Sequence, residues 1–342
     1  LLSLLCARVP VGLKMFAVGL VKQMVPALTH RLSRVRIGAM HCVSALVMCE
    51  DKAKCRGAGS AAIVDLIGHR DANVIPTAAF YFGEARVNSF AKLVLDSNAG
   101  VRYEFVEAMG TWMHDLPDRC DHHGRLVPYM LSMLSDASPR VQARALHWME
   151  RLGRQYEEER QQKDKVLERR QYGVDGDRYA EYDGFARPAP FQGRPRVGAR
   201  MFVRAHARRF IKPLLEELSD WRSETRVHAA LLLRTLIVYL EEHVTVHLHK
   251  LVGTLCRCAN GLSAEWSREC TALVCKFVPV DSFVALVLPI VNMDVDGAKG
   301  LRLGDCGGNT RARALVVLGE IVRGVKRKRL APHAADIAAC LG

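Results

Sequence analysis

The feature that most constrains the fold is a helical pattern that recurs six times along the 342 residues. Each copy begins at an anchor residue and places apolar or small residues four, seven and eight positions later. Residues at these offsets lie along one stripe of an α-helix, so each segment has an apolar face that it must bury. The anchors, in chain order, are Val35, Val101, Val141, Thr225, Trp266 and Thr310.

The spacing of the anchors indicates the kind of repeat. Successive anchors lie 66, 40, 84, 41 and 44 residues apart, and three of these intervals match the period of about 40–47 residues of HEAT and armadillo repeats. A second apolar helix precedes most anchors, often with an internal proline, as in Leu126–Leu131 and Ile211–Leu215. Such a proline marks a first turn or a kink, because it removes a helix hydrogen bond. We therefore predict an all-α fold, an α-solenoid of HEAT/armadillo-like helix pairs.

Two polar positions keep the same register in most copies. An arginine follows the anchor in four of them, and an aspartate precedes it by five positions in four. Such an aspartate can cap or close a turn, and it can pair with an arginine of the neighbouring repeat. We predict a structural ladder of Arg36, Arg102, Arg226, Arg311, Asp96, Asp136, Asp220 and Asp305.

The breaks in the period suggest three segments. We expect N-terminal repeats over 1–153, with an insertion at about 50–80 that includes a short helix around Ala61–Leu66. Residues 154–200 begin as a charged helix extension and continue as an irregular loop rich in Gly, Pro and Tyr. Residues 201–342 form C-terminal repeats. Loops longer than about 15 residues are usually functional or disordered, so the loop could be a contact site or a spacer.

The net charge of +13 would suit nucleic acid or an acidic protein surface as a partner. However, the basic residues are spread along the chain and usually lie near acids. The dense run Lys326–Arg329 reads either as the solvated end of a helix or as a nuclear localisation signal or phosphate patch. Nucleic acid is therefore not our favoured partner.

The sequence suggests no membrane association. We find no stretch approaching the roughly 20 apolar residues that span a bilayer, and Ser282–Met293 is closed off by Asp281 and Asp294. The first thirty residues carry three basic residues within an apolar pattern, which indicates an amphipathic helix rather than a signal peptide. The chain begins without methionine, as a fragment or a processed chain would. Eleven cysteines, an odd number in a long chain, fit a reducing cytosol.

Few residues offer chemistry. The best metal candidate combines His243, His247 and His249 with Cys256 and Cys258. The two cysteines are two positions apart on a predicted helix and would diverge by about 200°, so we predict no metal site.

A second set, Cys120, His122 and His123, lies in a polar segment that we interpret as a solvated turn. A nucleophile–base pair is conceivable there, but no oxyanion hole is evident nearby. No phosphate-loop, nucleophile-elbow, zinc-protease or EF-hand motif occurs, so we expect no enzyme, catalytic residue or cofactor. Trp148 and Trp266 fall on the repeat stripe and are predicted to be core, whereas Trp112 and Trp221 could be core or exposed.

Particular blocks of sequence say more than the repeat alone. Over about residues 20–290 the chain resembles the HEAT-repeat dynein axonemal assembly factors. Generic HEAT repeats lack two of these blocks, which span Leu152–Glu159 and Arg194–Arg200. The blocks that carry the resemblance are Arg34–Ala39, Val101–Arg102, Leu134–Asp136, Leu152–Glu159, Arg194–Arg200, Asp220–Trp221, Thr225–Val227, Glu242–His243 and Phe277–Val278.

This resemblance implies a cytoplasmic, non-enzymatic scaffold that acts in the preassembly of dynein arms for cilia or flagella. Its implied partners are dynein heavy or intermediate chains and other assembly factors or chaperones. Within the chain we predict a partner contact at Tyr156, Glu157, Arg194, Pro195 and Arg196, because these residues have no role in the repeat. The alternative is a general HEAT-repeat adaptor in nuclear transport or nucleic-acid-associated assembly.

Overall fold

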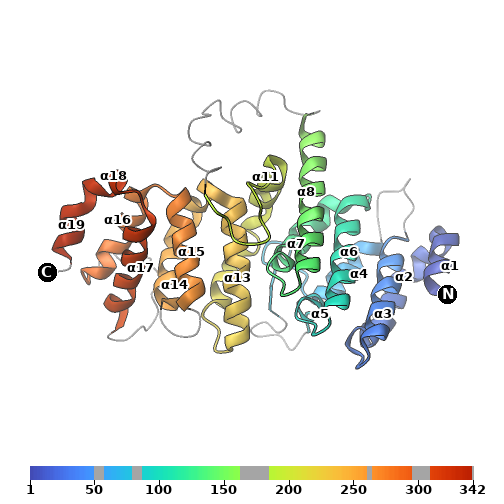
Figure 1. Cartoon of the computed structure of the whole chain (residues 1–342). Coiled ribbons are helices and arrows are strands. Elements are labelled where there is room, and N and C mark those ends of the chain that lie inside the picture. Colours follow the sequence, from blue (N-terminus) through green and yellow to red (C-terminus); the bar gives the residue numbers. More distant parts are fainter. Residues whose placement is uncertain (50–57, 79–86, 162–184, 260–263, 295–308, 341–342) are drawn as a thin grey trace. The chain divides into compact units, whose positions relative to one another are not determined.

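A computed structural model describes residues 1–49, 58–78, 87–161, 185–259, 264–294 and 309–340 (Figure 1). Throughout these residues the elements are helices, with no β-strand, which confirms the predicted all-α fold. The chain divides into two compact units. The N-terminal unit comprises Leu1–Val174 and Pro188–Pro213, and the C-terminal unit comprises Asp175–Arg187 and Leu214–Gly342.

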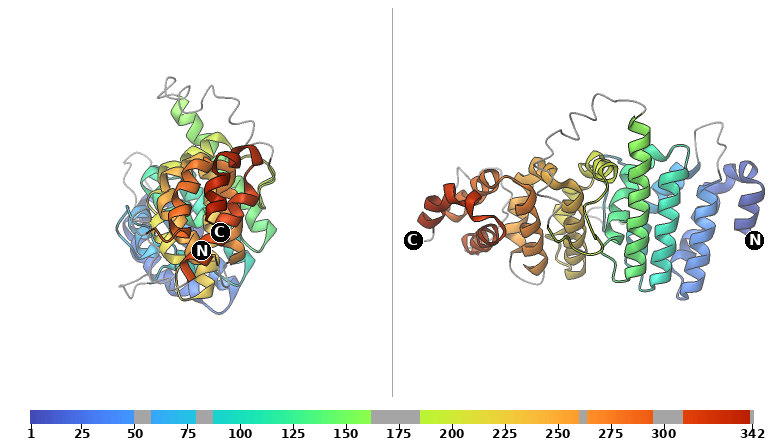
Figure 2. Two further views of the ribbon diagram at one scale, coloured as in Figure 1. Left: turned by 90° about the vertical axis from the view of Figure 1, so that its left-hand side faces the viewer. Right: turned by 45° about the horizontal axis from the view of Figure 1, so that its top comes forward.

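In the N-terminal unit, each repeat pairs a first helix with a longer second helix. The second helices are α3 (Ser33–Val47), α6 (Ala99–Asp115) and α8 (Pro139–Gln161), and they pack side by side in chain order (Figure 2). The other helices are α1 (Leu2–Arg8), α2 (Pro10–Met24), the 3₁₀ helix η1 (Val25–Thr29), α4 (Ala58–Ile67), α5 (Ser89–Val94), α7 (Arg119–Met133) and α11 (Val197–Ala207).

The C-terminal unit repeats the same plan. Its second helices α13 (Ser223–Leu240), α15 (Ala264–Phe277) and α17 (Thr310–Gly324) again pack against one another in sequence (Figure 1). The shorter elements are η2 (Glu241–His247), α14 (Leu248–Cys258), α16 (Val280–Val291), α18 (Arg327–Leu330), η4 (Ala331–His333) and α19 (Ala334–Ala339). Helix α12 (Ile211–Glu217) begins in the N-terminal unit and ends in the C-terminal one.

The stripe predicted from the sequence forms the core between second helices. In each of the six copies the residues four, seven and eight positions after the anchor are buried, apart from Cys42, which is half-buried. Phe105, Trp148 and Leu232 are each at most 3% exposed. Burying a side chain of this size contributes about 1.5–3 kcal/mol, so the stripe supplies the main cohesion between repeats.

Two expectations about local helices can be compared with the structure. The short helix predicted around Ala61–Leu66 is confirmed as α4, and α8 continues through the charged segment to Gln161. The loop predicted after it falls largely on residues 162–184, outside the described residues. The segment Pro10–Thr29 is long and apolar enough to cross a membrane by length and composition alone, so the expectation of no such stretch was wrong. Here α2 packs on α3 and α4.

The insertion before α5 is tied to the repeats by a buried aromatic group. Phe90 lies 5.3 Å from Phe105 and 5.4 Å from Tyr129, measured between ring centroids. The Tyr129 hydroxyl donates to the carbonyl of Pro76 at 2.8 Å and accepts from the side-chain amide of Asn88 at 2.9 Å. The buried hydroxyl therefore has partners, and it fixes the insertion onto α7.

We predict that Gly110→Ala destabilises the N-terminal unit by about 1–3 kcal/mol, the usual cost of overpacking. Gly110 is buried where α6 crosses α8, and an added Cβ would overlap the ring of Trp148. Gly38→Ala is the matched control, because nothing lies within 4 Å of an added Cβ there. We expect it to be neutral or stabilising, since alanine favours helix over glycine. Urea unfolding followed by circular dichroism measures both, and equal effects would contradict the packing argument.

Candidate functional site

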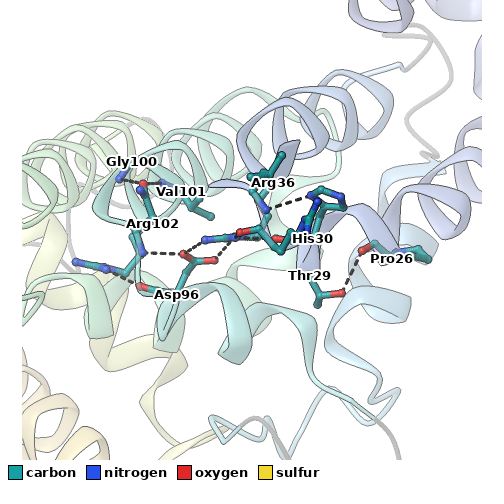
Figure 3. Close-up of polar contacts among 11 residues, drawn as sticks. Pro26, Thr29, His30, Arg36, Asp96, Gly100, Val101 and Arg102 are labelled. Carbon is teal, nitrogen blue, oxygen red and sulfur yellow. Dashed lines mark hydrogen bonds and ion pairs between the residues drawn. The ribbon is translucent and has the colours of Figure 1, made fainter. Parts of the chain in front are cut away.

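In the N-terminal unit, predicted ladder residues meet between neighbouring repeats, as Figure 3 shows for Arg36, Asp96 and Arg102. Arg36 on α3 binds the Asp96 carboxylate through one edge of its guanidinium, with Nε donating to Oδ2 at 2.7 Å and Nη2 donating to Oδ1 at 2.8 Å. Its remaining nitrogen, Nη1, donates to the carbonyl of His30 in the turn before its own helix at 2.7 Å. One arginine thus closes its own turn and clamps the next repeat.

Arg102 repeats this arrangement one helix further on. Its Nε and Nη2 donate to the two oxygens of Asp136 at 2.6 and 2.9 Å, and Nη1 donates to the carbonyl of Asp96. The hydrogen bonds that Arg102 donates to Asp136 raise the pKa of Arg102. Each aspartate also caps the following turn, accepting from the backbone N–H of Asn98 at 2.8 Å or Ser138 at 2.7 Å. Bidentate pairs of this kind fix geometry as well as adding energy.

The ladder stops where the repeat sequence departs from its pattern. Gln142 takes the arginine position on α8, and it donates to the backbone carbonyl of Asp136 instead of to a carboxylate.

In the C-terminal unit the Asp220 carboxylate binds Arg222 of its own turn, both oxygens at 3.1 Å from guanidinium nitrogens, and this bond lowers the pKa of Asp220. Arg226 donates only to the carbonyls of Asp220 and Trp221. Arg311 donates to the carbonyl of Cys340 at 3.2 Å, and Asp305 lies outside the described residues.

The predicted contact residues lie at the junction between α8 and α11. The Glu157 carboxylate accepts from the backbone N–H of Gly198 at 2.8 Å and from Nε of Arg196 at 3.3 Å. Because Gly198 is in the first turn of α11, the carboxylate also meets the positive end of that helix. The ring of Tyr156 lies 5.8 Å from that of Phe202, with the Arg160 guanidinium over its other side at 4.8 Å.

The two helices cross at glycines. A Cβ on Gly198 would overlap the carbonyl of Gly153, and one on Gly153 would crowd Ala199. Pro195 is buried, and its carbonyl accepts from Nε of Arg200 at 3.1 Å, whereas Arg194 is half-buried. The structure thus brings Tyr156, Glu157, Pro195 and Arg196 together in an intramolecular junction. A partner contact through these residues stays a prediction.

Next to this junction, His123 packs against Phe202 and His206, an arrangement that the sequence did not predict. His122 and His123 are buried near the start of α7, so the prediction of a solvated turn was wrong for them; only Cys120 is exposed. The ring of His123 packs 4.8 Å from Phe202 and 5.9 Å from His206, and its Nε2 donates to the carbonyl of Met113 at 2.8 Å. Burial lowers the pKa of His123 to about 4 and that of His206 to about 3.

Other candidates from the sequence do not form a chemical site in the described residues. The rings of His243 and His247 lie 6.1 Å apart, His249 is exposed, and Cys256 and Cys258 are buried in the helix core. No group of three or more His, Cys, Asp or Glu side chains in the described part of the chain could hold a metal ion.

The tryptophans divide between core and surface. Trp112 and Trp148 are buried, while Trp221 is 86% exposed. The prediction of a core Trp266 was wrong, because the ring is half-buried, with the Arg234 guanidinium over it at 5.4 Å.

Comparison with known proteins decides the family. Residues 187–342 match the model of the HEAT-repeat domain of dynein axonemal assembly factor 5, and residues 72–165 match the model of TPR repeats in dynein axonemal assembly factor 5-like proteins. The chain belongs to the dynein axonemal assembly factor 5 family. Both repeat types are stacked helix pairs, and the 40 residues between Val101 and Val141 are closer to a HEAT period than to the TPR period of 34.

Named relatives agree with this assignment. Human dynein axonemal assembly factor 5 is 28% identical over 276 residues, which cover 76% of this chain and 28% of the human protein. The Xenopus laevis protein of the same name is 22% identical over 339 residues, covering 96% of this chain and 33% of its own length. The chain therefore spans about a third or less of these family members. A solved engineered protein covers 89% of the chain at 13% identity with a TM-score of 0.27, too low to support an argument.

We predict that removing the Asp136 carboxylate by Asp136→Ala destabilises the N-terminal unit by about 3 kcal/mol. The Arg102–Asp136 pair is largely buried, and deleting one partner leaves a charge without compensation. Lys22→Ala is the control, because its pair with Asp65 is exposed and worth less than about 1 kcal/mol. Denaturant unfolding measures both variants. A loss at Asp136 no larger than that at Lys22 would contradict a stabilising ladder.

We predict that the free energy of unfolding falls as pH drops from about 6.5 towards 4. In the unfolded chain this histidine has a pKa near 6.5, whereas the buried His123 has a pKa of about 4. Between these pH values the unfolded chain binds a proton that the folded chain does not, so acid favours unfolding by up to about 3 kcal/mol. His123→Phe should lessen this slope, whatever its effect at neutral pH, and His206 and His228, whose pKa values burial also lowers, should supply the remainder. Gly38→Ala, which removes no titratable group, is the control and should keep the wild-type slope. Parallel pH profiles for His123→Phe and the wild type would rule out this assignment.

Proposed function

We propose that this chain forms part of a non-enzymatic scaffold in the cytoplasmic preassembly of axonemal dynein arms, before their transport into a cilium or flagellum. The family membership and the dynein assembly names of the relatives support the role. Its partners are then dynein heavy or intermediate chains, and other assembly factors or chaperones. Stacked helix pairs suit this work, because they present long surfaces on which many weak contacts add up.

The observation that carries a protein-binding role is a groove on the second helices of the C-terminal unit. It lies between α15 and α17 and has a volume of about 570 Å³, a size that can hold several side chains of a bound segment. Leu315, Val316 and Gly319 supply an apolar lining. The polar rim consists of Arg268 and the pair of Arg323 with Glu320, whose atoms lie 2.7 Å apart. An apolar centre with a polar rim is the usual anatomy of a protein interface.

The corresponding face of the N-terminal unit is different. Between α6 and α8 the polar side chains are already paired across the helices: Arg144 with Glu107, Arg140 over the ring of Tyr103, and Arg151 with His114. Such pairs order the surface and leave little apolar area to attract a partner. We therefore assign the main client contact to the groove, and we assign to the α8–α11 junction a structural role within the N-terminal unit.

We predict that depleting the protein in a flagellated cell removes dynein arms from axonemes and lowers the amount of heavy chain in the cytoplasm. Re-expressed wild type should restore both, and Gly319→Trp should restore them only in part. An added Cβ at Gly319 meets nothing within 4 Å, so the indole can occupy the groove without disturbing the helix. Electron microscopy of axonemes and quantitative blotting of heavy chain measure the outcome.

The control for this experiment is Gly38→Trp on α3, where the added Cβ likewise meets nothing within 4 Å. It should behave as wild type, because it adds the same bulk away from the groove. Intact arms after depletion would refute the dynein assembly role. Full rescue by Gly319→Trp would refute only the groove as the contact, and retention of the chain on RNA or DNA at about 0.15 M salt would favour a nucleic-acid adaptor instead.

A further inference from the structure

Arginines from three separate segments of the N-terminal unit come together beside α7, through the backbone carbonyl of Arg70 and the side chains of Arg125 and Arg209. Arg70 follows α4, Arg125 lies in the second turn of α7, and Arg209 follows α11. Arg125 donates through Nη2 to the carbonyl of Arg70 at 3.0 Å and through Nη1 to the carbonyl of Asp121 at 3.3 Å. The backbone N–H of Ile75 donates to the carbonyl of Arg209 at 2.9 Å, which joins the segment after α4 to the end of α11.

The Arg209 side chain lies directly over Gly124, the residue before Arg125. A Cβ at Gly124 would overlap its guanidinium and its Cδ. The glycine therefore makes room for a second guanidinium beside that of Arg125. Two further basic residues, Arg208 and Lys212, are exposed next to Arg209 in the sequence.

These three arginines differ from the ladder arginines of the unit and from Arg144. Arg36, Arg102 and Arg144 each bind an aspartate or glutamate, whereas the described residues offer no ion pair to Arg70, Arg125 or Arg209. Burial lowers the pKa of Arg125, and the neighbouring Arg209 lowers it further. Like charges are thus held together at a cost in free energy, and a bound anion would relieve it.

We infer that Arg70, Arg125 and Arg209 form a binding site for the carboxylates of an acidic polypeptide segment, with Arg208 and Lys212 at its edge. Guanidinium groups in a fixed arrangement suit carboxylates, which they can bind through two parallel hydrogen bonds. The inference deepens the proposed scaffold function, on which it rests for its biological meaning, by naming the chemistry of one partner.

The surroundings favour a peptide over a nucleic acid. Asp71 and Asp121 flank the arginines, and both raise the pKa of Arg125 through their negative charge. Fixed carboxylates at the margin would repel a continuous phosphate backbone, while a short peptide can space its own acids around them. No exposed aromatic ring stands beside the three arginines in the described residues to stack on a base, as single-strand binders require.

The test measures binding of a fluorescein-labelled decaglutamate peptide to the full chain by fluorescence anisotropy. We expect saturable binding that weakens as salt rises, with decaglutamine and a single-stranded DNA decamer binding less tightly. The triple variant Arg70→Gln, Arg125→Gln, Arg209→Gln should lose affinity about tenfold or more, since charge-assisted hydrogen bonds are removed.

Two double variants keep the result interpretable if Arg125 proves necessary for folding. Arg70→Gln with Arg208→Gln changes only exposed side chains and should weaken binding about threefold. Arg34→Gln with Arg154→Gln removes the same charge from exposed positions on α3 and α8, and should leave affinity within about twofold.

Equal losses in both doubles, tighter binding of DNA, or equal binding of decaglutamine would overturn the proposal. Because no dynein is present, such a failure leaves the scaffold role untouched. Intact dynein arms after depletion would refute the scaffold role and leave the peptide site standing.

Discussion

The structure depends on the burial of one apolar stripe per repeat between consecutive second helices. A single helix pair cannot hide that stripe, so each repeat is stable only beside its neighbours, and the energy of the stack is a sum of such contacts. Where helices approach most closely the chain places glycine. Gly110 admits the ring of Trp148, and Gly153 with Gly198 lets α8 cross α11. These contacts set how near one repeat can come to the next.

The ladder adds register to this cohesion. Apolar packing alone tolerates sliding, because it is non-directional, whereas the two parallel hydrogen bonds from Arg36 to Asp96 are satisfied at a single offset. Each arginine also binds the turn of its own repeat, so the turn and the helix-to-helix offset are fixed by the same side chain. The ladder ends at Gln142, which has no guanidinium. The next helix, α11, is held instead by the Glu157 carboxylate, which accepts a hydrogen bond from the first turn of α11.

The core, and the two ladder pairs of the N-terminal unit, could be predicted because both belong to the repeat. Residues such as Ala229 and Leu233 follow from helical spacing alone, and an aspartate five positions before an anchor has meaning only because it recurs. Contacts that occur only once in the chain could not be predicted in this way. The sequence around His123 is typical of a turn, and nothing in it shows that Phe202 of α11 packs on the ring. Trp266 has the spacing of a core residue, but the Arg234 guanidinium lies over its ring. The pairing of Glu157 with Gly198 joins residues 41 positions apart through a segment without periodicity.

The same reasoning separates structural charge from functional charge. A scattered excess of +13 says little, because arginines such as Arg102, Arg144 and Arg234 bind a carboxylate across a helix contact. What distinguishes Arg70, Arg125 and Arg209 is that packing brings them together without an ion pair, while Asp71 and Asp121 lie only at the margin. Stability alone would favour a glutamate at this place, as at Glu107 opposite Arg144. No such glutamate is paired with the three arginines in the described residues. We explain this by an acidic group that is supplied by another molecule.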